Sequence, residues 1–238
     1  MMKLKYIILA TVAFLLFSND LQSQGFIKTV VSLTGNVFNQ VTKQPETTAL
    51  LVMKDGKRVT ATRSRASENG YYYITGLKAG ESYDIKLQKS GFMDQQFSIQ
   101  VPNTDKYAEI SKDFLIMPKE VGVKLPLSVP PFEYNKSKLR VGSEILLDDL
   151  QETLKLNPDV KVQIISYPDN DKSPAANETL TKDRAESLKK FFANSGVSPE
   201  RMSIMANKTT DPDNPPPKEK AAKGKRYIGK SYIKIVSL

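Results

Sequence analysis

The sequence predicts an α+β protein in two folded parts: an antiparallel β-sandwich, followed by an α/β sandwich with helices on one face of a mixed sheet. Short alternating apolar runs separated by turn signals occupy residues 28–117, and helical and strand patterns alternate over residues 129–238. Between them, residues 118–131 contain four prolines, which favour an extended linker. The 238 residues suffice for two modest domains.

The first residues have the pattern of an export signal. Lys3 and Lys5 precede an apolar run from Tyr6 to Phe17, and a short polar stretch that contains Ser23 follows. The apolar run is shorter than the roughly 20 residues that a membrane-spanning helix needs, but it has the length of a signal-peptide core. We therefore expect a signal peptide over residues 1–24 and an exported protein.

The composition excludes several kinds of chemistry. The chain has no cysteine, so it has no disulfide, no thiolate nucleophile, no zinc–thiolate site and no lipid-carrying cysteine of the bacterial lipoprotein type. It also has no histidine, the commonest general base and transition-metal ligand. We therefore expect no metal and no cofactor. No second long apolar segment follows the first, so we expect no direct membrane span.

The net charge is +9, and the densest basic run extends from Lys218 to Lys230. Such a run can attract nucleic acid, anionic lipid or the acidic cell wall by long-range steering. A solvated basic loop is the simpler interpretation. For an exported protein we expect no nucleic-acid partner.

Short apolar or alternating runs predict seven strands in the first part. These strands cover residues 29–37, 49–54, 58–63, 71–75, 82–88, 95–101 and 108–116. Asp55 with Gly56 and Asn69 with Gly70 predict hairpin turns, because these residue types adopt positive φ at low cost.

Several motifs of this part occur in a fixed order. Leu33–Val37 is a first strand, Thr42–Pro45 a loop, and Asn69–Ile74 a turn with the strand that follows it. Leu77–Tyr83 is a Leu-x-x-Gly-x-x-Tyr strand pair, and Lys89–Phe92 ends in a Gly-aromatic pair. With these motifs the part resembles the carboxypeptidase regulatory-like family of Ig-like β-sandwiches. The resemblance implies a spacer or adhesion module without chemistry of its own.

Three consecutive tyrosines, Tyr71 to Tyr73, have two interpretations. One is a platform on which carbohydrate rings stack. However, alternation along a strand places Tyr72 on the opposite face from its two neighbours. We therefore expect a structural role, with at least one of these rings in the core.

The second part predicts a β-α-β-α-β…β order. Asn157 and Pro158 end the first helix, since the residue before a proline avoids the α region, and Asn177 is expected to be the N-cap of the second helix. The predicted strands cover Phe132–Tyr134, Val160–Ile164, Arg201–Ala206 and Ser231–Val236, with an additional edge strand within Val123–Val129, and the first helix covers Ser143–Leu156.

A second set of motifs follows this order of elements. Phe132 precedes Leu139 in the opening segment, and Asp169 ends the loop after the next strand. Asn177 lies eight residues further on and is followed by Leu180–Ala185, which contains an Arg-Ala pair. Gly196, Val197 and Arg201 then lead into the third strand. With these motifs in register, residues 129–238 resemble an OmpA-like C-terminal domain, a family that binds peptidoglycan.

The resemblance implies a ligand site built from Asp169 and Arg184. In that family this acid and this arginine hold the diaminopimelate residue of the peptidoglycan stem peptide. Asp169 would accept from the ligand ammonium, and Arg184 would bind its carboxylate bidentately. Backbone amides at the start of the helix at Asn177 would add donors. The other interpretation is that Asp169 and Arg184 form only a structural salt bridge.

This chain departs from the family pattern at two places. Ser166, Tyr167 and Pro168 stand where the family has Gly-His-Thr, and the closing strand lacks two family arginines. Arg226 and Lys230 are candidate secondary basic contacts that would compensate for that loss.

These observations favour a protein that is not an enzyme. We expect a periplasmic protein, associated with the cell wall or outer membrane, that anchors non-covalently to peptidoglycan through an open, zwitterion-sized pocket. The alternative is a degenerate OmpA-like domain that serves as an interaction scaffold for outer-membrane or secretion-complex proteins without wall binding. A hydrolase is disfavoured, because Asp169 and Asp171 have no second carboxylate placed across from them.

Overall fold

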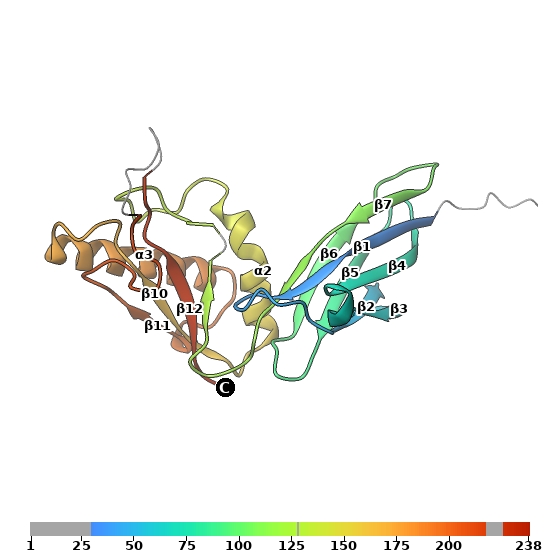
Figure 1. The fold of residues 1–238 in the computed structure, drawn as a ribbon, viewed down its shortest axis with the longest axis horizontal. Coiled ribbons are helices and arrows are strands. Elements are labelled where there is room, and N and C mark those ends of the chain that lie inside the picture. The colour runs from blue at the N-terminus through green and yellow to red at the C-terminus, as the bar shows by residue number, and fades with distance from the viewer. Residues whose placement is uncertain (1–29, 128, 218–225) are drawn as a thin grey trace, which may run out of the picture.

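The computed structural model describes residues 30–127, 129–217 and 226–238. Two bodies lie side by side, a β-sandwich formed by the first half of the chain and an α/β body formed by the second half (Figure 1). The predicted signal peptide at residues 1–24 and residues 218–225 of the basic run lie outside the described residues. The order of strands and helices agrees with the predicted α+β class.

The sandwich consists of two sheets. One has the order β4-β1-β7, with β8 also paired to β1, and the other has the order β3-β2-β5-β6. The strands are β1 (Val30–Asn39), β2 (Ala49–Lys54), β3 (Lys57–Arg63), β4 (Tyr71–Lys78), β5 (Ser82–Gln88), β6 (Gln95–Gln100), β7 (Ala108–Ser111) and β8 (Phe114–Ile116). The expected seventh strand is thus divided into two. Both of its pieces run parallel to β1. The prediction of a purely antiparallel sandwich is therefore wrong at this edge.

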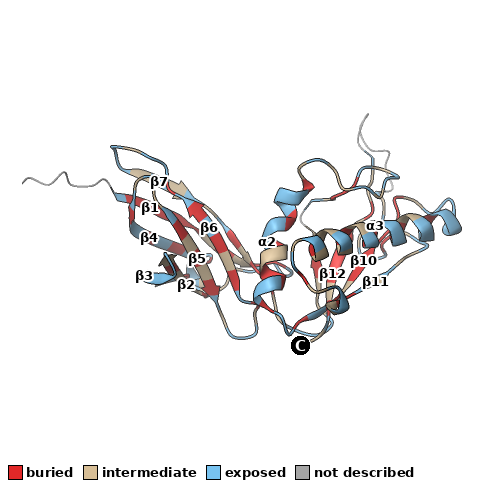
Figure 2. Ribbon diagram, turned by 180° about the vertical axis from the view of Figure 1, so that it is seen from behind, coloured by how far each residue is buried: buried red, intermediate tan, exposed pale blue. Residues whose placement is uncertain are grey.

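Alternation along the strands gives the sandwich its core. β4 alternates exposed and buried residues over most of its length (Figure 2). Tyr72 is buried, while Tyr71 and Tyr73 are exposed. The Tyr72 ring stacks on Phe114 and its hydroxyl donates to the Lys112 carbonyl at 2.6 Å. The expectation that at least one of these rings belongs to the core is therefore confirmed. The carboxypeptidase regulatory-like assignment stays a prediction.

The two predicted turns differ in what they connect. Asp55 and Gly56 have φ values of 49° and 74° and join the antiparallel hairpin β2–β3. Asn69 and Gly70 also have positive φ, but they follow a short 3₁₀ helix (Ala66–Glu68) and join strands of different sheets. A Cβ at Gly70 would come within 2.4 Å of the Val37 carbonyl oxygen, so only glycine fits there.

The α/β body contains a mixed four-stranded sheet of order β11-β10-β12-β9. β10 pairs parallel with β11 and antiparallel with β12, and β12 pairs antiparallel with the edge strand β9. These strands are β9 (Lys124–Pro126), β10 (Lys161–Ser166), β11 (Met202–Met205) and β12 (Ser231–Ser237). The edge strand predicted within Val123–Val129 is thus present. The predicted linker contributes it, and the exact domain limits stay a prediction.

Helices α2 (Ser143–Leu156) and α3 (Pro174–Asn194) bury their apolar sides in one cluster with alternate residues of β10 and β12. Leu150 of α2 and Leu188 of α3 share this cluster with Ile164. The intervening β10 residue Ile165 points to the other face of the sheet, where it packs with Tyr167 and Tyr232. The two helices therefore cover one face, as predicted.

Two local predictions are wrong. Phe132 makes only an isolated antiparallel bridge with Leu139, so no strand forms at Phe132–Tyr134. Asn177 is not an N-cap, because α3 begins three residues earlier, at Pro174 after Ser173. Proline has no backbone N–H and a helical φ, so it begins a helix at little cost.

The two bodies share part of one core. Met93 and Met117 come from the sandwich side of the chain but belong to the apolar cluster of the α/β body. Asn157 follows the end of α2. Its side-chain oxygen accepts from the Asp94 amide at 3.1 Å, and its side-chain nitrogen donates to the Asp94 carbonyl at 2.9 Å. Lys119 forms an ion pair with Asp159 at 2.7 Å. The two halves of the chain are therefore joined by apolar packing, hydrogen bonds and an ion pair as well as by the linker.

We predict that Met117→Ala lowers the free energy of unfolding by about 2–5 kcal/mol, the usual cost of truncating a buried large side chain. Met117 is only 5% exposed, whereas Met205 on β11 is 43% exposed. Urea denaturation of both alanine variants measures the difference. Equal, small losses for Met117→Ala and Met205→Ala would show that the shared core contributes nothing to stability.

Candidate functional site

The fold brings Asp169 and Arg184 into direct contact. Asp169 lies in the loop after β10, and Arg184 lies on the buried side of α3. The guanidinium donates to both carboxylate oxygens, at 2.7 Å and 2.9 Å, in a bidentate pair. Both side chains are 0% exposed. The predicted convergence of the acid and the guanidinium is thus present, with the two groups bound to each other.

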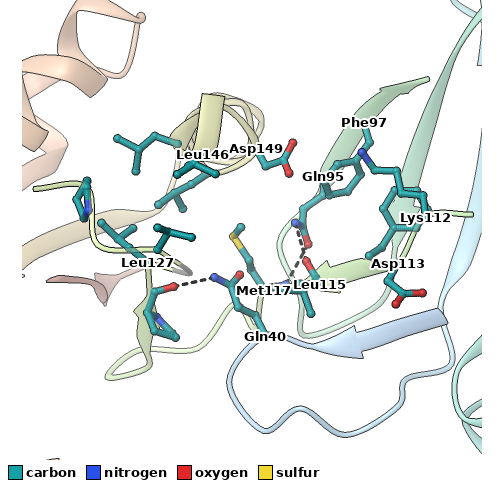
Figure 3. A pocket seen from close by; sticks show the side chains of 16 residues that line it. Gln40, Gln95, Phe97, Lys112, Asp113, Leu115, Met117, Leu127, Leu146 and Asp149 are labelled. Carbon is teal, nitrogen blue, oxygen red and sulfur yellow. Dashed lines mark hydrogen bonds between the residues drawn. The ribbon is translucent and has the colours of Figure 1, made fainter. Parts of the chain in front are cut away.

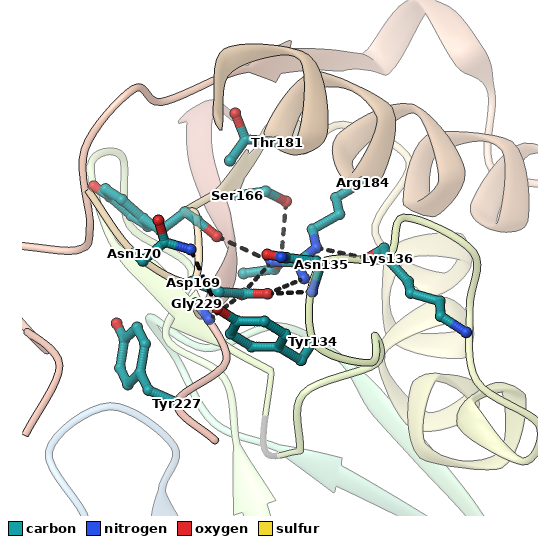
Figure 4. A network of polar contacts seen from close by, with 12 residues as sticks. Tyr134, Asn135, Lys136, Ser166, Asp169, Asn170, Thr181, Arg184, Tyr227 and Gly229 are labelled. Atoms are coloured by element: carbon teal, nitrogen blue, oxygen red, sulfur yellow. Dashed lines mark hydrogen bonds and ion pairs between the residues drawn. The ribbon is translucent and has the colours of Figure 1, made fainter. Parts of the chain in front are cut away.

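Backbone groups complete the hydrogen bonding of this pair (Figure 4). The Asn135 and Gly229 amides donate to Asp169, at 2.6 Å and 2.7 Å. The guanidinium donates to the carbonyls of Glu133, Lys136 and Tyr167, at 3.1, 2.9 and 3.3 Å. We call residues 133–136 and 226–229 the cover, because both segments lie against the ion pair. The expectation of an open, zwitterion-sized pocket is therefore wrong for this structure.

Glycine is required at one point of the cover. A Cβ at Gly229 would come within 2.1 Å of the Tyr167 carbonyl oxygen, so a larger residue would displace the backbone. This close approach lets the Gly229 amide reach Asp169. The neighbouring Tyr227 donates to the Asn214 carbonyl at 2.6 Å, and burial together with nearby carboxylates raises the pKa of Tyr227 to about 12.

The remaining predicted site residues do not touch the ion pair through their side chains. Asn177 donates to the carbonyls of Asn170 and Lys208, at 2.6 Å and 3.0 Å, and so joins two loops. The Arg226 guanidinium lies 5.0 Å from the centre of the Tyr134 ring, on the cover. Lys230 donates to the side-chain oxygen of Asn214 at 2.5 Å.

Sequence reasoning missed the backbone groups of the cover. The one sequence feature near them is the spacing of Phe132 and Leu139. It identified the opening segment of the domain but did not indicate that the backbone of this segment contacts the ion pair. The Phe132 ring also lies 5.3 Å from the Arg184 guanidinium carbon, so the opening segment contributes an aromatic face as well.

Residues 131–226 match the model of the OmpA family. This part of the chain is an OmpA-family domain. No curated protein matches the chain. Within the described ranges, no helix is long and apolar enough to cross a membrane, and no group of three or more Asp and Glu side chains is placed to hold a metal ion.

Solved structures similar to the chain include other OmpA-like domains. The peptidoglycan-associated lipoprotein of Burkholderia pseudomallei is 16% identical with a TM-score of 0.36, over 46% of this chain and 88% of that one. The OmpA-like domain of FopA1 from Francisella tularensis is 13% identical with a TM-score of 0.36, over 50% and 86%. The periplasmic domain of MotB from Helicobacter pylori is 13% identical with a TM-score of 0.39, over 65% and 79%. With all TM-scores below 0.5, the assignment of the OmpA-family domain rests on the family match.

We predict that Asp169→Ala and Arg184→Ala each lower the free energy of unfolding by about 3–5 kcal/mol, because each leaves an unpaired charge in the interior. The double variant should lose less than the sum of the two, since it removes both charges. Chemical denaturation measures all three. Lys136→Ala is the matched control: its ion pair with Glu133 is 65% and 60% exposed and should contribute at most about 1 kcal/mol.

Proposed function

We propose that this chain is a non-catalytic, exported cell-envelope protein whose OmpA-family domain associates non-covalently with peptidoglycan. The observation that carries the proposal is the bidentate contact of Asp169 with Arg184. These are the two positions at which the family resemblance expects the diaminopimelate contacts. The proposed localisation is the periplasm, at the cell wall or outer membrane.

The chemistry of the pair suits a zwitterionic ligand. The side chain of diaminopimelate ends in an ammonium and a carboxylate on one carbon. In the bound state the ammonium would replace Arg184 as the partner of Asp169, and the carboxylate would replace Asp169 as the partner of Arg184. Such an exchange keeps charge-assisted hydrogen bonds on both protein groups. It therefore avoids leaving a buried charge without a partner.

Access to the pair requires the cover to open. The Asn135 and Gly229 amides and the Glu133 and Lys136 carbonyls would separate from the pair, and all four belong to segments outside any helix or strand. Their loss is an energetic cost that the ligand has to offset. We therefore propose binding weaker than an open, preorganised site would give.

A buried ion pair is also an expensive way to hold a fold. Removing two charges from water costs several kcal/mol per ion, and well-packed apolar residues often stabilise a core as well or better. A fully buried acid and arginine therefore fit a binding role more readily than a purely structural one.

The absence of catalysis is part of the proposal. The chain has no histidine or cysteine to act as base or nucleophile. Asp169 is fully engaged with Arg184, and Asp171 accepts two hydrogen bonds from Thr210, at 2.6 Å and 2.9 Å. The two carboxylates are therefore not arranged as a working pair.

A second candidate function is a scaffold for envelope proteins without wall binding. The observation that favours it is that both side chains of the pair are 0% exposed. In that case Asp169 and Arg184 serve only to clamp α3 to the cover, and the cover never opens.

Co-sedimentation with isolated, diaminopimelate-containing sacculi tests the proposal. We expect the mature protein to pellet with sacculi. A soluble stem peptide that contains meso-diaminopimelate should release it, whereas the same peptide with lysine at that position should not, because the lysine side chain ends in an ammonium without a carboxylate. Arg184→Gln should reduce binding at least tenfold. Failure of the native protein to pellet at low and moderate salt would support the scaffold and refute wall binding.

Arg201→Gln is the control for lost stability. Arg201 lies in the same domain and donates to the carbonyls of Val160, Leu154 and Asn157, so this change also disturbs buried hydrogen bonds. It should leave sedimentation unchanged at a temperature where the variant remains folded. If Arg184→Gln and the native protein pellet equally, with a strong dependence on salt, basic surface charge binds the wall and the pair does not.

A further inference from the structure

A groove runs between helix α2 of the OmpA-family domain and the edge strand β6 of the sandwich. One cavity of about 170 Å³ and a second of about 490 Å³ both have Phe97 and Asp149 in their linings, so the two adjoin. Figure 3 shows Leu146 and Asp149 on the α2 side and Gln95 and Phe97 on the sandwich side. We call these two adjoining cavities the interdomain groove.

One end of the groove has apolar walls. Leu127, Leu146 and Pro126 line the smaller cavity together with the Phe97 ring. Leu146 is 50% exposed, and its neighbour Ile145 is 75% exposed. Leu146 lines the smaller cavity with half of its surface exposed, so this end of the groove can accept an aliphatic group.

The other end of the groove is acidic. Asp148, Asp149 and Glu152 of α2 face Gln96 and Ser98 of β6 across the larger cavity. Glu152 already pairs with Lys155 at 2.6 Å, but no described base forms an ion pair with Asp148 or Asp149. Burial raises the pKa of Asp149, and the nearby Lys112 ammonium offsets only part of that rise. A cationic partner would offset this cost of burying the carboxylate.

The sandwich wall carries charges of both signs. Lys112 and Asp113 both line the smaller cavity, and the Lys112 ammonium lies over the Phe97 and Phe114 rings, at 5.5 Å and 5.8 Å from their centres. Across both cavities, acidic side chains outnumber the one basic side chain. The groove is therefore locally negative on a protein whose net charge is +9.

A second, independent feature of the groove is an unused acceptor. Gln40 is 6% exposed and lines the smaller cavity, where its Nε2 donates to the Pro126 carbonyl at 3.1 Å. Its Oε1 is buried and accepts no hydrogen bond. A buried acceptor without a donor costs about 1–3 kcal/mol. If the Gln40 amide turned toward the cavity, a bound donor would remove that cost.

We propose that the interdomain groove binds an extended segment of a partner protein in which Lys or Arg side chains alternate with aliphatic ones. The basic side chains pair with Asp148 and Asp149, and the aliphatic ones occupy the wall around Leu146. Opposite charge favours such a partner, because the groove is locally negative and attracts basic side chains. The site is separate from the Asp169–Arg184 pair and does not depend on wall binding.

Selection from a randomised octapeptide library on the immobilised full chain tests this proposal. We expect recovered peptides to be enriched in Lys or Arg next to Leu, Ile or Val. The best of them should bind at least tenfold more weakly to the double variant Asp148→Asn/Asp149→Asn. Leu146→Ser and Gln40→Met should each weaken binding severalfold, by removing an apolar contact and the free acceptor.

The matched control is Asp183→Asn/Glu186→Gln on the exposed side of α3, which changes the net charge by the same amount at a distance from the groove. It should leave peptide affinity unchanged. Equal weakening by both double variants would reduce the effect to general electrostatics and overturn the proposal. Recovery of peptides without basic enrichment would overturn it as well.

Discussion

The bidentate contact between Asp169 and Arg184 holds together the segments of the OmpA-family domain that have no strand or helix of their own. Through it, helix α3 is tied to the loop after β10 and to both segments of the cover. Two opposite charges can remain in the interior only if each has a full set of partners. The irregular path of residues 133–136 and 226–229 follows from that requirement, because it delivers the amides and carbonyls that complete the set.

Patterned elements were predictable from the sequence because they follow from local periodicity. The limits of β2, β5 and α2 agree with their predicted ranges residue for residue. The start of α3 was not predictable from Asn177, because Pro174 offers an earlier start and the Asn177 amide joins two loops instead. The convergence of the acid and the arginine came from the family resemblance. The burial of this ion pair under the cover was not predicted, because it depends on backbone groups whose positions only the tertiary structure determines.

The junction of the two bodies shows the same limit of sequence reasoning. A proline-rich segment predicts a linker, and part of it instead forms the edge strand β9. Met93, Met117 and Asn157 carry no pattern that marks them as contacts between domains, yet they connect the sandwich to the core of the OmpA-family domain. Contacts of this kind fix the position of the sandwich relative to the domain that we propose binds the wall.

Helix α2 lies between the core of the OmpA-family domain and the interdomain groove. Its apolar side, with Leu147, Leu150 and Leu154, is buried in the core that also holds Leu188 of α3, four residues beyond Arg184. Its acidic side lines the interdomain groove. Leu147 and Leu150 also line the smaller cavity, so a peptide in the groove would lie next to residues of this core. Because the core is close-packed, α2 cannot shift without disturbing the packing against α3. No residue belongs to both sites, so peptide binding in the groove and wall binding at the ion pair are independent proposals.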